Sequence, residues 1–395
     1  MMPAQGALRR RASAPLAAAL LMMLVLAQGC ALLRPEQPTP ELRRMAGQML
    51  LIGFRGAEPY DAAEKPLPIL AQISELNLGG VILFDRDAIL GNGRNIQSPA
   101  QLARLTSAIS RAAAQADMPP LFIAVDQEGG RVQRLKPING FPATPAAARL
   151  CPDDDDAPAF DAGRSIGRTL REAGVNLDFA PVCDVNVNPQ NPVIGALDRS
   201  FSADPVRAAA CAAAFARGLK SQGILTAAKH FPGHGSSNAD SHLGFTDVTQ
   251  TWSEAELGPF AALIRQHLAD MVMTAHVYNS RLDGKDPATL SRPVITGVLR
   301  GRLGYKGVVV TDDMQMRAVS GKYGFKEALG RAVNAGADIL LIGDNLEYDV
   351  QIGPKALDDL MELVAEGVVP AARIRESYAR IMDLKQRGLA TAGAL

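Results

Sequence analysis

Short apolar runs alternate with amphipathic segments from about residue 40 of this 395-residue chain onward. The runs are mostly continuous, which is typical of parallel strands buried on both faces. Eight runs of this kind cover 49–54, 79–84, 121–126, 174–182, 223–230, 270–276, 307–312 and 337–342. The amphipathic segments between them predict helices, among them 100–116, 159–173, 204–222, 253–269 and 323–335.

This alternation favours one fold class. Eight strand–helix units over about 300 residues predict an α/β fold of the (β/α)₈ TIM-barrel type, because a doubly wound sheet usually has fewer strands. Two further helices, at 354–367 and 370–386, would complete a single domain spanning residues 41–390. Three helices carry start signals, at Ser98-Pro99, at Asp204-Pro205 and from Thr251 to Glu254.

The N-terminal segment has a different character. Arg9 to Arg11 precede an apolar stretch from Ala14 to Gly29, and Cys30 and a proline-rich stretch follow. A basic start, a short apolar core and a small residue before the expected cleavage position are typical of a secretory signal. The apolar stretch is also short for a membrane span.

The residues LAQGC also resemble a bacterial lipoprotein box, in which Cys30 would be lipidated. An ordinary cleaved signal and an uncleaved anchor are the alternatives. We therefore expect residues 1–30 to direct export and residues 31–40 to form a tether. The protein would then be a membrane-anchored lipoprotein facing the periplasm or the cell exterior.

Charge and cysteine content narrow the classes of partner. Forty-one basic residues balance forty-one acidic ones without a basic stripe, which argues against a nucleic-acid partner. Beyond Cys30, the cysteines Cys151, Cys183 and Cys211 form an odd set without a close pair. Such a set is a poor disulfide framework and has no metal-ligand spacing, so we expect three small buried hydrophobic residues.

Polar side chains gather where the predicted strands end. In a (β/α)₈ barrel the carboxyl ends of the strands carry the active site. The stretch 225–244 is its expected centre, because a strand there leads into a loop rich in histidine and glycine. The polar residues at or just beyond strand ends are Asp126, Asp184, Lys229, His230, His276 and Asp312.

Two of these positions suggest catalytic groups. The apolar strand before Asp312 would hold its carboxylate rigidly, as a nucleophile requires, whereas Asp313 fits a helix N-cap better. His242 lies two residues after Asp240, so the imidazole could act as a general acid/base that the carboxylate orients.

The third strand ends in a second polar motif, VDQEGGRVQR. Asp126 with the nearby Arg134 could clamp the vicinal hydroxyls of a sugar, and a structural ion pair is the alternative. We expect Glu128 to support the turn rather than to take part in chemistry.

Four motifs together resemble the family 3 glycoside hydrolases, in the single-domain branch of β-N-acetylhexosaminidases. They are FIAVDQEGGRVQR, NLDFAPVCDVNVNPQNPVIGALDRSFS, KHFPGHG followed by DSH, and VVVTDDMQM, and the resemblance extends from about residue 40 to 386. The other branch, the β-glucosidases, usually adds a second domain and lacks the DSH loop. The resemblance implies a retaining exo-glycosidase that releases terminal β-N-acetylglucosamine from peptidoglycan fragments or chitin-like oligosaccharides.

The resemblance also implies roles for individual residues. Asp312 corresponds to the nucleophile, His242 to the acid/base and Asp240 to its partner. No metal and no cofactor are implied. The positions that match the family's sugar-binding residues are Asp126, Arg134, Arg199, Lys229 and His230.

Several alternatives and expectations accompany this interpretation. A metal-dependent barrel hydrolase, a non-catalytic sugar-binding lipoprotein, and a β-glucosidase or other β-exo-glycosidase are the rival functions. The glycines and small residues of the loop 233–244 suggest that it closes over the sugar. The acidic run 153–156 and the loop 91–99 read as solvated surface without a role.

Overall fold

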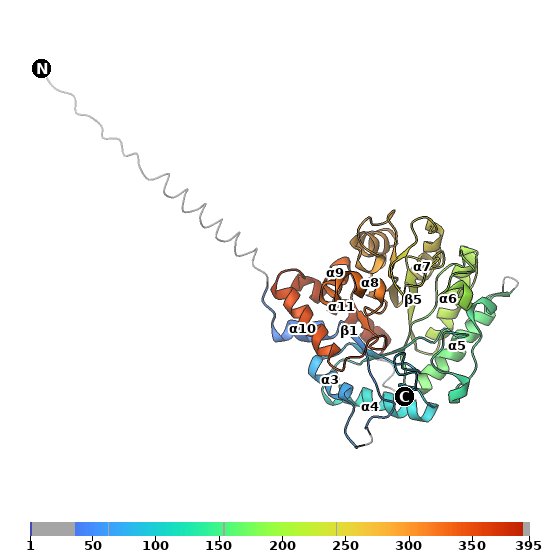
Figure 1. Cartoon of the computed structure of the whole chain (residues 1–395), viewed down its shortest axis with the longest axis horizontal. Coiled ribbons are helices and arrows are strands. Elements are labelled where there is room, and N and C mark those ends of the chain that lie inside the picture. The colour runs from blue at the N-terminus through green and yellow to red at the C-terminus, as the bar shows by residue number, and fades with distance from the viewer. Residues whose placement is uncertain (2–35, 62, 153–154, 242, 390–395) are drawn as a thin grey trace.

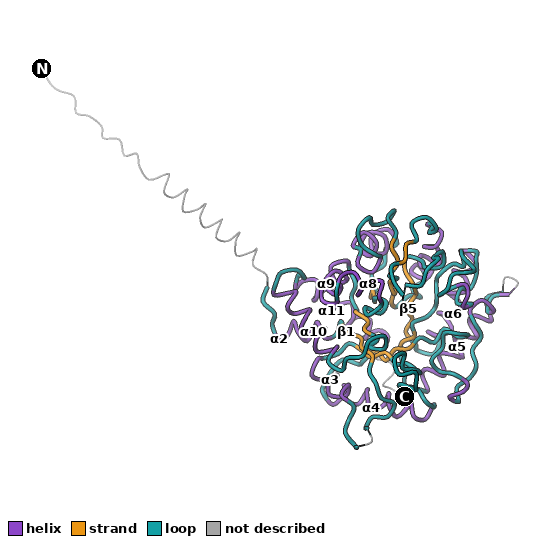
Figure 2. The backbone as a smooth tube through the Cα atoms, in the orientation of Figure 1, coloured by secondary structure: helices purple, strands orange, loops and turns teal. Residues whose placement is uncertain are grey.

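The computed structural model describes residues 1, 36–61, 63–152, 155–241 and 243–389. Its centre is an eight-stranded parallel sheet with the strand order β10-β1-β2-β3-β4-β5-β7-β9. The two end strands, β9 (Val308–Val310) and β10 (Leu340–Ile342), meet through a parallel bridge between Val310 and Ile339. The sheet thus forms a nearly closed barrel with helices around it, and the predicted fold class is confirmed (Figure 2).

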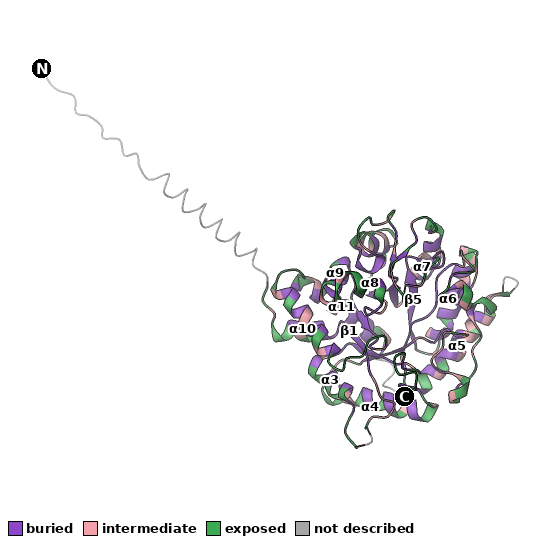
Figure 3. Ribbon diagram, in the orientation of Figure 1, coloured by how far each residue is buried: buried purple, intermediate pink, exposed green. Residues whose placement is uncertain are grey.

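All eight predicted strands are present. Every residue of these strands is buried, and Figure 3 shows buried ribbon through the centre of the molecule, which explains why the runs are continuous rather than alternating. A small second sheet pairs β6 (Thr246–Asp247) with β8 (Val277–Tyr278), and its strands are too short to leave a sequence pattern. The remaining barrel strands are β1 (Leu50–Gly53), β2 (Gly80–Ile82), β3 (Phe122–Val125), β4 (Leu177–Asp178), β5 (Leu225–Phe231) and β7 (Met271–Thr274).

Helices surround the barrel (Figure 1). The predicted helices correspond to α4 (Pro99–Gln115), α5 (Ala157–Glu172), α6 (Pro205–Lys220), a 3₁₀ turn η5 (Glu254–Leu257) with α7 (Gly258–Arg265), α9 (Phe325–Ala335), α10 (Ile352–Ala365) and α11 (Ala371–Gly388). Helices that the pattern did not predict are α2 (Pro40–Gly47), α3 (Pro68–Leu76), α8 (Arg317–Tyr323) and the π-helix η7 (Pro293–Arg302).

The predicted helix starts are confirmed in their hydrogen bonds. The side chain of Ser98 accepts from the backbone N–H of Gln101, forming a capping box at the start of α4. Asp204 caps α6 through the N–H groups of Val206 and Arg207. Ser253 forms the equivalent capping box before η5.

A buried carboxylate fastens the last barrel strand to its neighbour. Asp338, just before β10, is fully buried, and its Oδ2 accepts the backbone N–H of Val309 at 3.0 Å. Arg300 of η7 lies 2.6 Å from Oδ2, while Arg373 and Arg380 of α11 lie 2.7 and 3.0 Å from Oδ1. Side chains from η7 and α11 therefore support the closure of the barrel.

Cys151 and Cys211 form a disulfide with an S–S distance of 2.05 Å. The expectation of unpaired cysteines was wrong for this pair, because the fold brings the segment before α5 beside α6, although the two positions are 60 residues apart in sequence. Cys183 is buried and free, as expected. The predicted signal and Cys30 lie outside the described residues, and no helix within the described ranges has the length and apolar character to cross a membrane.

The disulfide leads to a prediction about stability. Reducing it should lower the free energy of unfolding by about 2–4 kcal/mol, because the link restricts a long loop of the unfolded chain. Denaturant midpoints measured with and without reductant test this. The double variant Cys151→Ala/Cys211→Ala keeps Cys183 and should not respond to reductant. Identical midpoints for oxidised and reduced wild type would contradict the prediction.

Candidate active site

One cavity of about 700 Å³ opens at the carboxyl ends of the barrel strands. A larger cavity of about 1000 Å³ lies elsewhere, between η7 and α11, and contains none of the predicted site residues. His242 lies outside the described residues. All the other predicted catalytic and binding residues line the barrel cavity, namely Asp126, Arg134, Arg199, Lys229, His230, Asp240 and Asp312.

Strand β5 delivers two consecutive side chains to this cavity. Neighbouring residues of a regular strand point to opposite faces. The register between β5 and β7 shifts between Ala228 and Phe231, and this irregularity lies at Lys229 and His230. A local break of this kind redirects side chains, so both residues can line the cavity.

The buried ammonium of Lys229 is the centre of an ionic cluster. Its Nζ lies 2.8 Å from Oδ1 of Asp126 and 2.6 Å from Oε1 of Glu128. Arg134 contacts the other oxygen of Asp126 at 3.2 Å. Burial opposes the charge of Lys229, but attraction to the two carboxylates outweighs it and raises the pKa of the ammonium. Burial likewise opposes ionisation of Asp126, yet Lys229 and Arg134 hold its pKa below the usual range.

Glu128 also belongs to this cluster, and its ion pairs extend beyond the turn that the sequence suggested it supports. Arg199 grips its carboxylate with two hydrogen bonds, from Nε at 2.8 Å and from Nη2 at 2.7 Å. Attraction to Arg199 and Lys229 overcomes the effect of burial and lowers the pKa of Glu128. The Gly129-Gly130 pair suggested a turn, whereas the partner Arg199 is 71 residues away and leaves no local signal.

A second carboxylate orients His230. Oδ2 of Asp184 lies 2.6 Å from Nδ1 of the imidazole, while Oδ1 accepts the backbone N–H of His230 at 3.2 Å. Nε2 of the ring lies 3.4 Å from Arg199. The fully buried Asp184 thus holds His230 in place at the cavity wall. The sequence placed Asp184 at a strand end but gave no sign of this role.

Asp312 follows β9, and one of its oxygens accepts the backbone N–H of Asp313 at 2.8 Å. Asp313 is not the helix N-cap that the sequence suggested, because α8 begins only at Arg317. Its Oδ1 accepts the N–H groups of Gln315 and Gly343, each at 3.0 Å. Asp313 therefore ties the loop after β9 to the loop after β10.

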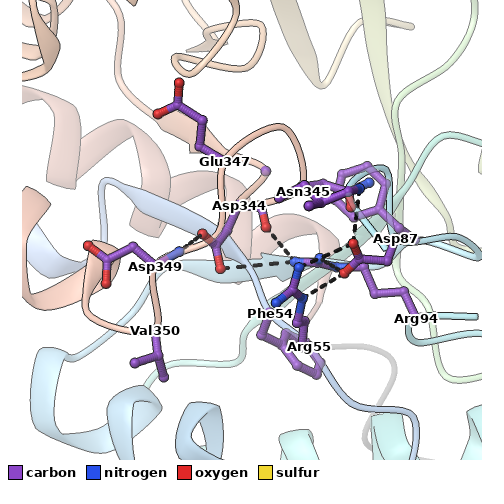
Figure 4. A network of polar contacts seen from close by, with 12 residues as sticks. Phe54, Arg55, Asp87, Arg94, Asp344, Asn345, Glu347, Asp349 and Val350 are labelled. Carbon is purple, nitrogen blue, oxygen red and sulfur yellow. Dashed lines mark hydrogen bonds and ion pairs between the residues drawn. The ribbon is translucent and has the colours of Figure 1, made fainter. Parts of the chain in front are cut away.

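A network of arginines and aspartates supports another wall of the cavity (Figure 4). The carboxylate of Asp87 accepts from Arg55 at 2.7 Å and from Arg94 at 2.8 Å, and Arg94 also donates to the backbone oxygen of Asp344 at 2.6 Å. These contacts join the loops after β1, β2 and β10. Arg94 is buried, so the expectation that 91–99 is solvated surface without a role was wrong for this residue.

Asn345 extends this support to the cavity itself. Its side chain accepts from the N–H of Ala88 at 2.9 Å and donates to the backbone oxygen of Arg86 at 3.2 Å. All three residues line the cavity. Among the residues that the structure describes, no group of three or more histidine, cysteine, aspartate or glutamate side chains is arranged to hold a metal ion.

The ionic cluster predicts the effect of replacing Lys229 with methionine. Lys229→Met leaves the buried Glu128 and the partly buried Asp126 without their shared cation, so the free energy of unfolding at pH 7 should fall by roughly 3–5 kcal/mol. The matched variant Lys326→Met removes an ammonium that pairs with exposed glutamates and should cost less than about 1 kcal/mol. Denaturant unfolding measures both changes.

The same variant should alter the pH dependence of stability. The lowered pKa values of Asp126 and Glu128 stabilise the wild type above their unfolded values near pH 4, and this contribution is lost as pH falls through the folded values. Without Lys229 these pKa values rise. The difference in unfolding free energy between wild type and Lys229→Met should therefore narrow below about pH 4. A difference that stays constant with pH would contradict the attribution of the lowered pKa values to Lys229.

Comparison with known proteins assigns the chain to a family. The family model described as the glycosyl hydrolase family 3 N terminal domain matches residues 42–384. Beta-hexosaminidase A of Pseudoalteromonas piscicida is 34% identical over 373 residues, which cover 87% of this chain and 61% of the relative. The chain thus spans about three fifths of the length of that protein.

Solved structures agree in fold. A glycoside hydrolase family 3 β-N-acetylglucosaminidase from Paenibacillus sp. str. FPU-7 superposes with a TM-score of 0.80 at 39% identity, over 90% of this chain and 64% of its own. The β-N-acetylhexosaminidase from Beutenbergia cavernae gives a TM-score of 0.76 at 29% identity, over 87% of this chain and 98% of its own. The barrel, its cavity and the family match lead to one conclusion: the chain belongs to glycosyl hydrolase family 3.

Proposed function

We propose that this family 3 protein is a retaining exo-β-N-acetylhexosaminidase, with peptidoglycan fragments or chitin-like oligosaccharides as substrates. The observation that supports this most directly is the gathering of Asp312, Asp240 and the Lys229 cluster around one cavity. The names of the similar proteins, which are hexosaminidases and β-N-acetylglucosaminidases, support an N-acetylated sugar.

The proposed reaction has two steps. In the first, Asp312 attacks the anomeric carbon while His242, oriented by Asp240, protonates the departing glycosidic oxygen. In the second, water attacks the anomeric carbon of the glycosyl-enzyme, His242 takes the proton of the water, and the carboxylate of Asp312 is released. A histidine thus replaces the second carboxylic acid of the usual scheme.

The ionic cluster would hold the sugar. Asp126 offers carboxylate oxygens and Arg134 offers N–H donors, and vicinal hydroxyl groups can use both kinds of partner. Because Lys229 and Arg134 fix Asp126, these groups need little reorganisation when the sugar arrives. Arg199 and His230 line the same cavity and complete the proposed binding set.

Hydrolysis of paired substrates tests the proposal. Protein lacking residues 1–30 is expected to cleave 4-nitrophenyl β-N-acetylglucosaminide in strong preference to the matching β-glucoside. Asp312→Asn should lower kcat/KM by on the order of 10³-fold or more, because the nucleophile is lost. Asp117→Asn, an exposed replacement after α4, is the matched control and should keep full activity.

The other outcomes have distinct meanings. Preference for the glucoside would leave the nucleophile in place but overturn the sugar specificity. Absence of cleavage of either substrate would favour a sugar-binding protein without catalysis. Substantial activity in Asp312→Asn would overturn the proposed nucleophile.

We also propose that the protein is exported and anchored through a lipid on Cys30. Two independent observations support export: the signal-like segment 1–30 and the Cys151–Cys211 disulfide. Disulfides of this structural kind persist in oxidising compartments outside the cytosol.

Replacement of Cys30 tests the anchor. The full-length wild type should partition into the membrane fraction, whereas Cys30→Ala should shift to the soluble fraction or remain as an unprocessed precursor. Mass spectrometry of the N-terminal peptide should find an acylated Cys30 in the wild type. Cys183→Ala removes a different cysteine and should stay with the membranes. A soluble wild type would contradict the anchor.

A further inference from the structure

The loop that follows β5 is connected internally by a buried histidine. The ring of His234 is 3% exposed, and its Nε2 lies 3.0 Å from the hydroxyl of Ser241. Ser241 is itself buried, at 2% exposed, and stands directly between Asp240 and His242 in the sequence. A contact at Ser241 therefore acts at the centre of the DSH triplet.

The backbone at His234 is firmly fixed to the loop after β4. Its N–H donates to Asp184 at 2.8 Å, and its carbonyl accepts from the side chain of Asn191 at 2.7 Å. The next residue, Gly235, packs so closely that a Cβ there would lie 1.7 Å from the carbonyl oxygen of Val185. The backbone that carries the imidazole is thus fixed to the loop after β4. Ser241 contacts the ring at Nε2, the ring nitrogen farther from this backbone.

The tip of the same loop also rests on the loop after β4. Asn188 donates to the carbonyl oxygen of Ser237 and to the side chain of Asn238, each at 2.9 Å. The chain then turns toward Asp240, which lines the cavity. The contact of His234 with Ser241 joins the later part of the loop to its start, where the backbone is fixed.

The electrostatics of His234 suit a neutral hydrogen-bonding role. Burial is the largest influence and lowers the pKa of the ring to about 4, against a smaller opposing effect of Asp184. Nδ1 is buried without a hydrogen-bond partner, so Ser241 is the one hydrogen-bond partner of the ring among the described residues. Displacing Ser241 would leave a buried ring with both nitrogens unpaired, and this penalty favours the observed loop position.

We propose that His234 is a positioning residue for the acid/base group: through Ser241 it holds Asp240, the carboxylate proposed to orient that group, at the cavity. This inference rests on the proposed function. His234 does not touch the reacting atoms in this role. Its loss should therefore weaken proton transfer to and from the substrate while the nucleophile Asp312 remains intact.

Dependence on the leaving group distinguishes this role from a general structural one. Diacetylchitobiose needs protonation of its departing oxygen, whereas a 2,4-dinitrophenyl glycoside departs without it. For His234→Leu, kcat/KM with diacetylchitobiose should fall about tenfold or more, the effect of losing one hydrogen bond, and kcat/KM with the dinitrophenyl substrate should stay within about twofold of wild type.

The second step gives an independent readout. With the dinitrophenyl substrate, kcat and KM of His234→Leu should fall together, because glycosyl-enzyme accumulates when water is poorly activated. Azide needs no base, so it should restore kcat by displacing Asp312 and forming a β-glycosyl azide. A misplaced nucleophile would instead lower kcat/KM for both substrates and would not respond to azide.

Matched variants separate the hydrogen bond from the bulk of the ring. His234→Gln places an amide nitrogen near the position of Nε2 and should recover most of the activity with diacetylchitobiose. Ser241→Ala should reproduce the defect of His234→Leu, and the double variant should be no worse than either single one. Thr106→Val removes a remote buried hydrogen bond, to the carbonyl oxygen of Ala173, and should lower stability without any leaving-group dependence.

Each failure has its own signature. Equal losses with both leaving groups, or a glutamine variant as impaired as the leucine variant, would overturn the positioning role while Asp312→Asn still abolishes wild-type activity. If the wild type cleaves neither substrate, or if Asp312→Asn stays active, the proposed function fails and the positioning role fails with it.

Discussion

The cavity depends on one buried positive charge. The ammonium of Lys229, carried by β5, binds a carboxylate on either side and so fixes the loop after β3. Glu128 also pairs with Arg199, and this ion pair fixes the long loop after β4. A charge buried at this depth is stable only when it is paired, so the sequence must supply Asp126 and Glu128 together with Lys229.

The remaining loops follow the same principle of mutual support. Asp313 links the loops after β9 and β10, and Asp87 links those after β1 and β2 through Arg55. The loops that form the cavity are therefore held by contacts with neighbouring loops. Fixed polar groups of this kind can stabilise developing charge without first reorganising.

The sequence predicted features that have local causes. The barrel strands were evident because burial on both faces produces continuous apolar runs, and Asp126, Lys229 and Asp312 stood out because they lie at strand ends. Arg94 was misjudged, and the ion pairs of Glu128 went unnoticed, because their partners lie elsewhere along the chain. The cysteine pair was missed for the same reason, since only tertiary packing brings the segment before α5 beside α6.

The closure of the barrel has a consequence for how the chain folds. Strand β1 pairs with β10, and Asp338 before β10 is held by Arg373 and Arg380 near the end of the chain. Strand β1 therefore cannot complete its pairing until β10 is present. This pairing joins residues far apart in sequence, and contacts of such high contact order slow folding. Until β10 has left the ribosome, the sheet keeps two unpaired edges, which are templates for association with other strands. Closure of the barrel therefore requires its last strand.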